Sequence, residues 1–184
     1  MATLYKDKRG LSQVVTTLIL LMVSVLLAGV VTYLATNIVM TRTQQEEVRL
    51  TKQHIWVNST GAVGAFMLQN LGGKDVLMDK IEVRGVTSSW SNVYYCRIPS
   101  GTTITADLNV TSYDRLMGLN ATIDGRTYSQ ASDDIPVTSG EVLLFYIKGP
   151  DNINLDDVGT TVSVAAYTIN GPYIVECNVG SANR

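Results

Sequence analysis

The sequence predicts an α+β protein in which a long N-terminal hydrophobic α-helix precedes an antiparallel Ig-like β-sandwich. No charged residue occurs between Arg9 and Arg42. After about residue 54, the chain divides into short β-branched and aromatic runs separated by Gly, Asn and Asp, which is typical of strands and turns. No amphipathic helical pattern occurs in that second half. We therefore expect a helix over residues 11–53 and a β-sandwich over residues 54–184.

The N-terminal helix is predicted to be longer than a bilayer requires. Leu11 to Met40 is an uncharged segment of about thirty residues, whereas roughly 20 span a hydrocarbon core and a cleaved secretory signal has only about 7 to 15. Lys8 and Arg9 would hold the N-terminal side in the cytoplasm. Neither Pro nor Gly interrupts the chain between Val30 and His54. A helix to Gln53 would measure roughly 65 Å, about twice the hydrocarbon thickness.

The second half of the chain is predicted to consist of strands joined by turns. Asn170-Gly171 lies between two apolar runs and is a strong β-hairpin signal. Residues 71–75, LGGKD, are predicted to form a turn joining adjacent strands, and residues 111–134 a long loop or irregular strands. The expected strands are Ile55–Asn58, Ala62–Asn70, Val76–Val83, Val93–Ile98, Thr102–Leu108, Val142–Lys148, Thr161–Ile169 and Tyr173–Val179.

Charge and motif content exclude several functional classes. The net charge of −2, with a pI near 5.3 and no basic cluster after residue 10, argues against a nucleic-acid partner. The single histidine, His54, is expected to be a solvated surface residue and not a general base. The sequence contains no G-x-S-x-G, H-E-x-x-H or phosphate-loop motif. We therefore expect neither an enzyme nor a cofactor.

Two further groups of residues leave alternatives open. Asn152, Asn154 and Asp156 could converge on a hard cation such as Ca²⁺, but the EF-hand glycine and distal glutamate are missing, which favours a solvated turn. Cys96 and Cys177 could form a disulfide in an exported domain, or they could be two buried free thiols. A bridge would close a loop of about eighty residues, worth on the order of 4 kcal/mol in the chain-entropy model.

The N-terminal segment carries a family resemblance. The head KDKRG, followed directly by LSQVVTTLILLMVSVLLAG, resembles the class III signal peptide of archaeal type IV pilins and archaellins. The resemblance implies that a prepilin-type signal peptidase recognises Lys8, Arg9 and Gly10, removes residues 1–10, and leaves Leu11 as the first mature residue. It also implies that the helix first lies in the membrane and is then extracted into the core of a filament.

Two positions help to choose within this group. Bacterial type IV pilins usually have glutamate at the fifth mature position, where this chain has Val15. Archaellins typically carry a glycine near the third mature position, where this chain has Gln13. The first difference disfavours the bacterial branch, and the second favours an archaeal adhesive pilus over an archaellin. An archaellin of the swimming filament is the first alternative, and a monomeric membrane-anchored β-sandwich binding module is the second.

The expected function is therefore that of a structural subunit in an extracellular, type IV pilus-like filament. Its partners would be identical subunits, the signal peptidase and the membrane assembly machinery, and its precursor would lie in the cytoplasmic membrane with the N-terminus inside. Three N-x-[ST] sequons occur in the second half, at Asn58, Asn109 and Asn120. Because archaeal filament subunits are often glycosylated, the resemblance makes each of them a candidate N-glycosylation site.

Overall fold

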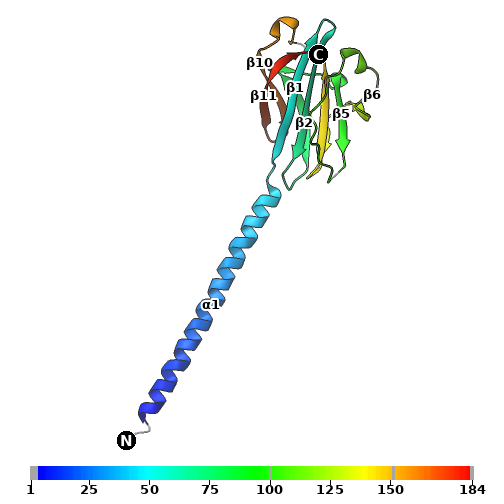
Figure 1. Cartoon of the computed structure of the whole chain (residues 1–184). Coiled ribbons are helices and arrows are strands. Elements are labelled where there is room, and N and C mark those ends of the chain that lie inside the picture. The colour runs from blue at the N-terminus through cyan, green and yellow to red at the C-terminus, as the bar shows by residue number, and fades with distance from the viewer. Residues whose placement is uncertain (1–3, 100, 151, 183–184) are drawn as a thin grey trace. The chain divides into compact units, whose positions relative to one another are not determined.

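The computed structural model of the chain describes residues 4–99, 101–150 and 152–182 (Figure 1). It divides into two compact units, Met1–Thr43 and Gln44–Arg184. The first is the helix α1, Leu4–Gln44, and the second is a β-domain. The α+β class predicted from the sequence is confirmed.

The predicted extent of the helix is wrong at its C-terminal end. The helix ends at Gln44, and strand β1, Val48–Asn58, begins within the stretch where the helix was expected to continue to Gln53. Val48 and Leu50 are buried while Arg49 between them is exposed, so this segment has the two-residue period of a strand. Burial of these side chains outweighs the helical propensity of the neighbouring polar residues.

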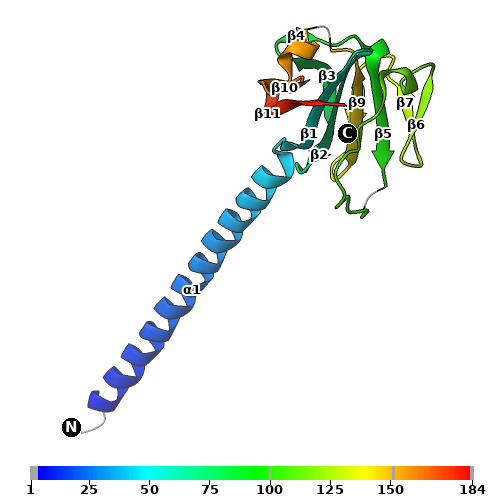
Figure 2. The same cartoon turned by 45° about the horizontal axis from the view of Figure 1, so that its top comes forward.

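The β-domain is one curved sheet, and the Ig-like sandwich of two separate sheets is not confirmed. Hydrogen-bonded neighbours follow the order β4-β3-β10-β11-β1-β2-β9-β5-β7-β6, with β8 pairing with β3. Figure 2 shows this sheet curling, with β10 and β11 on one side of β1 and with β9, β5, β7 and β6 on the other. The bounds of the strands after β1 are β2 Gly61–Asn70, β3 Val76–Val83, β4 Val86–Thr87, β5 Val93–Ile98, β6 Asn120–Ile123, β7 Arg126–Gln130, β8 Ile135–Val137, β9 Val142–Lys148, β10 Thr161–Thr168 and β11 Pro172–Ser181.

One parallel pairing joins the two halves of the sheet. β1 is antiparallel to β2 along most of its length, but it pairs with β11 in parallel over Ile55–Val57, opposite Val179–Ser181. The remaining strand pairs are antiparallel in the described part of the chain. The first and last strands of the domain are therefore neighbours.

Most of the expected strands are present. β3, β5 and β9 have the predicted bounds, and β10 and β11 form the hairpin predicted from Asn170-Gly171. Residues 102–108, predicted as a strand, form no strand, whereas β6 and β7 lie within the region expected to be a loop or irregular strands. The turn at residues 71–75 is present, but the strands that it joins, β2 and β3, are not paired with each other.

The curved sheet carries a hydrophobic cluster on each face. The first cluster fills the inside of the curl and includes Ile55 and Ile81, together with Phe66 and Phe145, whose rings stack at 4.9 Å. The second cluster includes Tyr128 and Tyr146, packed edge to face at 5.0 Å, and it is covered by the chain between β5 and β6 through Leu108 and Leu116. The β-domain therefore has a complete core of its own.

Candidate functional site

The helix α1 exposes an apolar surface along its length. Within Gly10–Thr41 an 18-residue window has a mean hydropathy of 2.8, and none of that window is buried. Leu11 is 73% exposed, and Leu18, Leu26 and Leu34, spaced eight residues apart, are 63%, 65% and 53% exposed. A helix that is hydrophobic all round belongs in lipid or among other apolar helices, since water disfavours such a surface.

Six hydroxyl groups in this helix are hydrogen-bonded within the helix. The side chains of Thr16, Ser24, Thr32 and Thr36 donate to backbone carbonyl oxygens three or four residues earlier at 2.8 Å, and Thr17 and Thr41 do the same. An unpaired hydroxyl costs free energy in an apolar environment. These bonds allow the helix to carry several hydroxyls through lipid or through a packed helix bundle at low cost.

Small residues interrupt the bulky apolar surface near the middle of α1. Ser24, Ala28 and Gly29 lie between larger aliphatic side chains. A Cβ added at Gly29 would meet no atom of the described chain within 4 Å. Small side chains allow the backbones of neighbouring helices to approach closely.

The segment that follows α1 is fixed to the β-domain through Glu46. One carboxylate oxygen of Glu46 accepts hydrogen bonds from the Thr168 hydroxyl at 2.6 Å and from the Tyr173 hydroxyl at 3.3 Å, and the other accepts one from the Asn170 amide. All three donors belong to the β10–β11 hairpin. Burial and the adjacent Glu46 carboxylate raise the pKa of Tyr173, which keeps its hydroxyl a donor.

The β2–β3 turn fixes the same segment from another direction. The carbonyl of Glu47 accepts hydrogen bonds from the backbone N–H groups of Leu71 and Gly72 at 2.7 and 3.1 Å. A Cβ at Gly72 would lie 2.6 Å from the carbonyl oxygen of Gln45 and 2.7 Å from the nitrogen of Glu47. Only glycine fits this contact between two backbones. We call residues 45–47, held by Glu46 and Gly72, the exit clamp.

The predicted processing residues lie at the start of α1. Lys8, Arg9, Gly10 and Leu11 are all helical in backbone conformation, and the side chains of Lys8 and Arg9 are outside what the structure describes. Gly10 and Leu11 are exposed. Cleavage after Gly10 stays a prediction.

Cys96 and Cys177 are free thiols in the structure, and no disulfide joins them. Cys96 on β5 packs against the second hydrophobic cluster and Cys177 on β11 against the first, which places them on opposite faces of the sheet. Burial raises the pKa of Cys177 to about 11 and also raises that of Cys96. Both thiols are therefore poor nucleophiles at neutral pH.

Two of the three candidate cation ligands, Asn152 and Asn154, make hydrogen bonds within the turn. Asn152 donates to the carbonyl of Arg84, and Asn154 caps the short 3-10 helix Leu155–Asp157 by a reciprocal hydrogen bond with Asp157. Asp157, which lies beside this set in sequence, forms an ion pair with Arg84 at 2.8 Å. Among the described residues, no group of three or more His, Cys, Asp or Glu side chains is placed to hold a metal ion. These contacts, and the exposure of Asn154 and Asp156, favour the solvated-turn interpretation.

His54 has a partner that sequence reasoning missed. Its Nε2 lies 2.9 Å from a carboxylate oxygen of Asp107, and its ring stacks on Trp56 at 5.1 Å. Burial acts to raise the pKa of Asp107, but hydrogen bonds from His54 and from the backbone of Leu108 outweigh it and lower that pKa. The pair fastens the chain between β5 and β6 to β1. No spacing pattern could have revealed it, because the residues are far apart in sequence.

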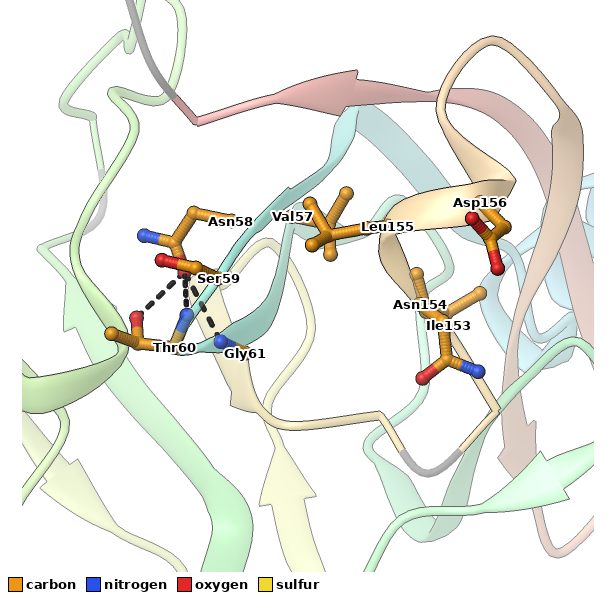
Figure 3. A pocket seen from close by; sticks show the side chains of 9 residues that line it. All are labelled: Val57, Asn58, Ser59, Thr60, Gly61, Ile153, Asn154, Leu155 and Asp156. Atoms are coloured by element: carbon orange, nitrogen blue, oxygen red, sulfur yellow. Dashed lines mark hydrogen bonds between the residues drawn. The ribbon is translucent and has the colours of Figure 1, made fainter.

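A pocket of about 400 Å³ lies between the β1–β2 turn and the segment before β10 (Figure 3). Residues 57–61 line one side of it and residues 153–156 the other. It contains the first sequon, since Asn58, Ser59 and Thr60 form the turn. The other two sequon asparagines, Asn109 and Asn120, are exposed and lie outside its lining.

Comparison with known proteins adds no relative. No family model matches the chain, and no curated protein matches it.

Proposed function

We propose that this protein is the structural subunit of an extracellular filament, in which the α1 helices of many copies form the core and the β-domains form the outer layer. The observation that carries the proposal is the apolar helix Gly10–Thr41, exposed on all sides, next to a β-domain with a complete core of its own. Burying one leucine or isoleucine side chain contributes roughly 1.5–3 kcal/mol. Mutual burial of such helices would hold a polymer together without covalent links.

The length of the helix favours a bundle over a simple anchor. At 1.5 Å per residue, the 32-residue span Gly10–Thr41 measures about 48 Å, whereas a hydrocarbon core is about 30 Å thick. A single-pass anchor does not use the excess, but overlapping helices in a staggered bundle do. A head-to-tail contact that does not close on itself produces an open helical filament. Before assembly, the same helix would hold the precursor in the membrane.

The exit clamp supports this function. Thr168 and Gly72 both contact residues 45–47, so this segment is held to the β-domain. A subunit that must repeat in a regular lattice benefits from a short free linker, because long loose linkers would give variable contacts. A monomeric binding module tethered to a membrane has no such requirement.

N-terminal sequencing of material sheared from the cell surface, combined with electron microscopy, tests the proposal. We expect fibres whose subunits begin at Leu11. Substituting Gly10 with leucine should leave an unprocessed precursor in the membrane. Surface material with an intact Met1 and no fibres would overturn the filament function in favour of the anchored monomer.

A pair of helix variants separates a filament core from a membrane anchor. Gly29→Leu adds bulk at a small position while keeping the helix apolar, so membrane insertion should be normal and filaments should be lost. Val30→Leu enlarges the adjacent residue only slightly and serves as the matched control. If both variants form normal filaments, close packing at Gly29 is not part of the core. The pilus and archaellum versions of the function are distinguished by deleting the gene and scoring attachment and swimming.

A further inference from the structure

The three sequons differ in the conformation of their asparagine side chains. At Asn58, Oδ1 accepts three hydrogen bonds, from the backbone N–H of Thr60 at 3.0 Å, the Thr60 hydroxyl at 2.6 Å and the backbone N–H of Gly61 at 3.1 Å (Figure 3). Within the described chain, the Asn58 Nδ2 group donates no hydrogen bond, and Figure 3 shows it on the far side of the amide from these contacts. The sequon asparagine and its threonine are therefore already together, with the amide nitrogen free.

This arrangement suits chemistry at the amide nitrogen. An amide nitrogen is a weak nucleophile because its lone pair is delocalised into the carbonyl. Hydrogen bonds to Oδ1 from Thr60 and Gly61 make the protons of Nδ2 more acidic, which favours their loss during the reaction, and they hold the amide in one rotamer. The geometry is local, since it needs only the tip of the β1–β2 hairpin, and Ser59 and Thr60 are exposed.

The other two sequons lack this arrangement. The Nδ2 group of Asn109 donates to the Asp124 carboxylate at 2.9 Å, and the hydroxyl of Thr111, the sequon threonine, is buried. Asn120 lies in strand β6, and its Oδ1 accepts from Ser129 on the neighbouring strand at 3.1 Å instead of from its own sequon threonine. Modification at Asn109 would require its amide to leave Asp124, whereas Asn120 lies in an extended strand and lacks the turn that joins Asn58 to its sequon threonine.

We propose that Asn58 is the N-glycosylated residue of this protein. Nδ2 would attack the anomeric carbon of a glycosyl phosphate or pyrophosphate donor bound by a transferase. A C–N bond forms, the bond from the anomeric carbon to the phosphate oxygen breaks, and a proton leaves Nδ2 for a base of the transferase. The inference rests on the proposed function only in that the β-domain must reach a compartment with such a transferase.

Glycopeptide mass spectrometry of the full-length protein purified from the organism that makes it tests the assignment. We expect a glycan on the peptide containing Asn58 and bare peptides at Asn109 and Asn120. Asn58→Gln should remove the glycan mass, whereas Asn109→Gln and Asn120→Gln should leave it unchanged. Thr60→Ser should retain the modification, because it keeps the hydroxyl, and Thr60→Ala should lose it.

A bare Asn58 would overturn the whole inference. If that bare protein is found in filaments, the proposed function survives, and if it is found as unprocessed monomer, the proposed function fails as well.

Discussion

The hydroxyl of Thr168 donates a 2.6 Å hydrogen bond to the carboxylate of Glu46, across 122 residues of sequence. This contact joins the first residues after α1 to the β10–β11 hairpin. Thr168 is only 6% exposed, so its hydroxyl depends on a protein acceptor.

Replacing Glu46 with alanine should destabilise the β-domain. The variant leaves the donors of Thr168, Asn170 and Tyr173 without their shared acceptor, and we expect the free energy of unfolding to fall by about 1–3 kcal/mol. Urea unfolding of the full chain in detergent, followed by tryptophan fluorescence, measures this because both tryptophans, Trp56 and Trp90, lie in the β-domain.

Glu47→Ala is the matched control for that experiment. Glu47 is exposed, and its part in the exit clamp is through its backbone carbonyl, which alanine keeps. Its effect should stay within about 0.5 kcal/mol. Equal losses of unfolding free energy in the two variants would show that the negative charge of residues 46 and 47, and not the hydrogen bonds of Glu46, determines stability.

Gly72→Ala should disturb the other side of the exit clamp. The new methyl group would lie 2.6 Å from the Gln45 oxygen, so two backbone segments must move apart, at a cost of about 1–3 kcal/mol. Gly171→Ala is the control, because a Cβ there meets no described atom within 4 Å. If the same unfolding measurement gives equal midpoints for the two variants, the close approach at Gly72 is not required.

Stability at acid pH should depend on Glu141. Burial acts to raise the pKa of this carboxyl, but the hydrogen bond from Arg97, with a 2.6 Å ion pair, and those from Thr138 lower it by more. A depressed folded-state pKa gives stability that is present above the unfolded value, near 4.3, and is lost as the pH falls through the folded value.

The measurement is the free energy of unfolding between about pH 6 and pH 3. The wild-type curve should fall more steeply than that of Glu141→Gln, which has no carboxylate to protonate at that position. Parallel curves would mean that Glu141 contributes nothing to acid sensitivity.

The two cysteines should behave as protected free thiols. Iodoacetamide at neutral pH should modify the folded protein slowly, because burial raises the pKa of Cys177 to about 11 and also that of Cys96. In denaturant without reductant, both cysteines should be alkylated, which intact-mass measurement detects. An unmodified mass under those conditions would reveal a Cys96–Cys177 bridge and require the two strands to be rearranged.

The sequence predicted those elements whose pattern is local. The runs at β3, β5 and β9 are apolar, short and bounded by turn residues, and their predicted bounds are the observed ones. The first half of β1 was missed because its polar residues are good helix formers, and only burial of Val48 and Leu50 against distant strands makes it a strand. Residues 102–108 have strand-like composition, but Ile104 and Leu108 pack over the second cluster instead of joining the sheet.

The features of the candidate site also divide into those with a local sequence pattern and those that depend on distant contacts. The apolar surface of α1 and the three sequons can be read from the residues, because each is a continuous pattern. The exit clamp cannot be read in this way, since Glu46 meets partners 122 to 127 residues away. The distinction between Asn58 and Asn109 is equally hidden, because it depends on Asp124 and on the burial of Thr111.

The parallel contact between β1 and β11 determines when the β-domain can become complete. Ile55–Val57 lie near the start of the domain and Val179–Ser181 at its end. The two halves of the sheet can therefore pair with each other only after nearly all of the domain has been synthesised. Long-range closure of this kind makes folding slow. A chain that ends before residue 179 would therefore lack this pairing, and its two groups of strands would not be joined into one sheet.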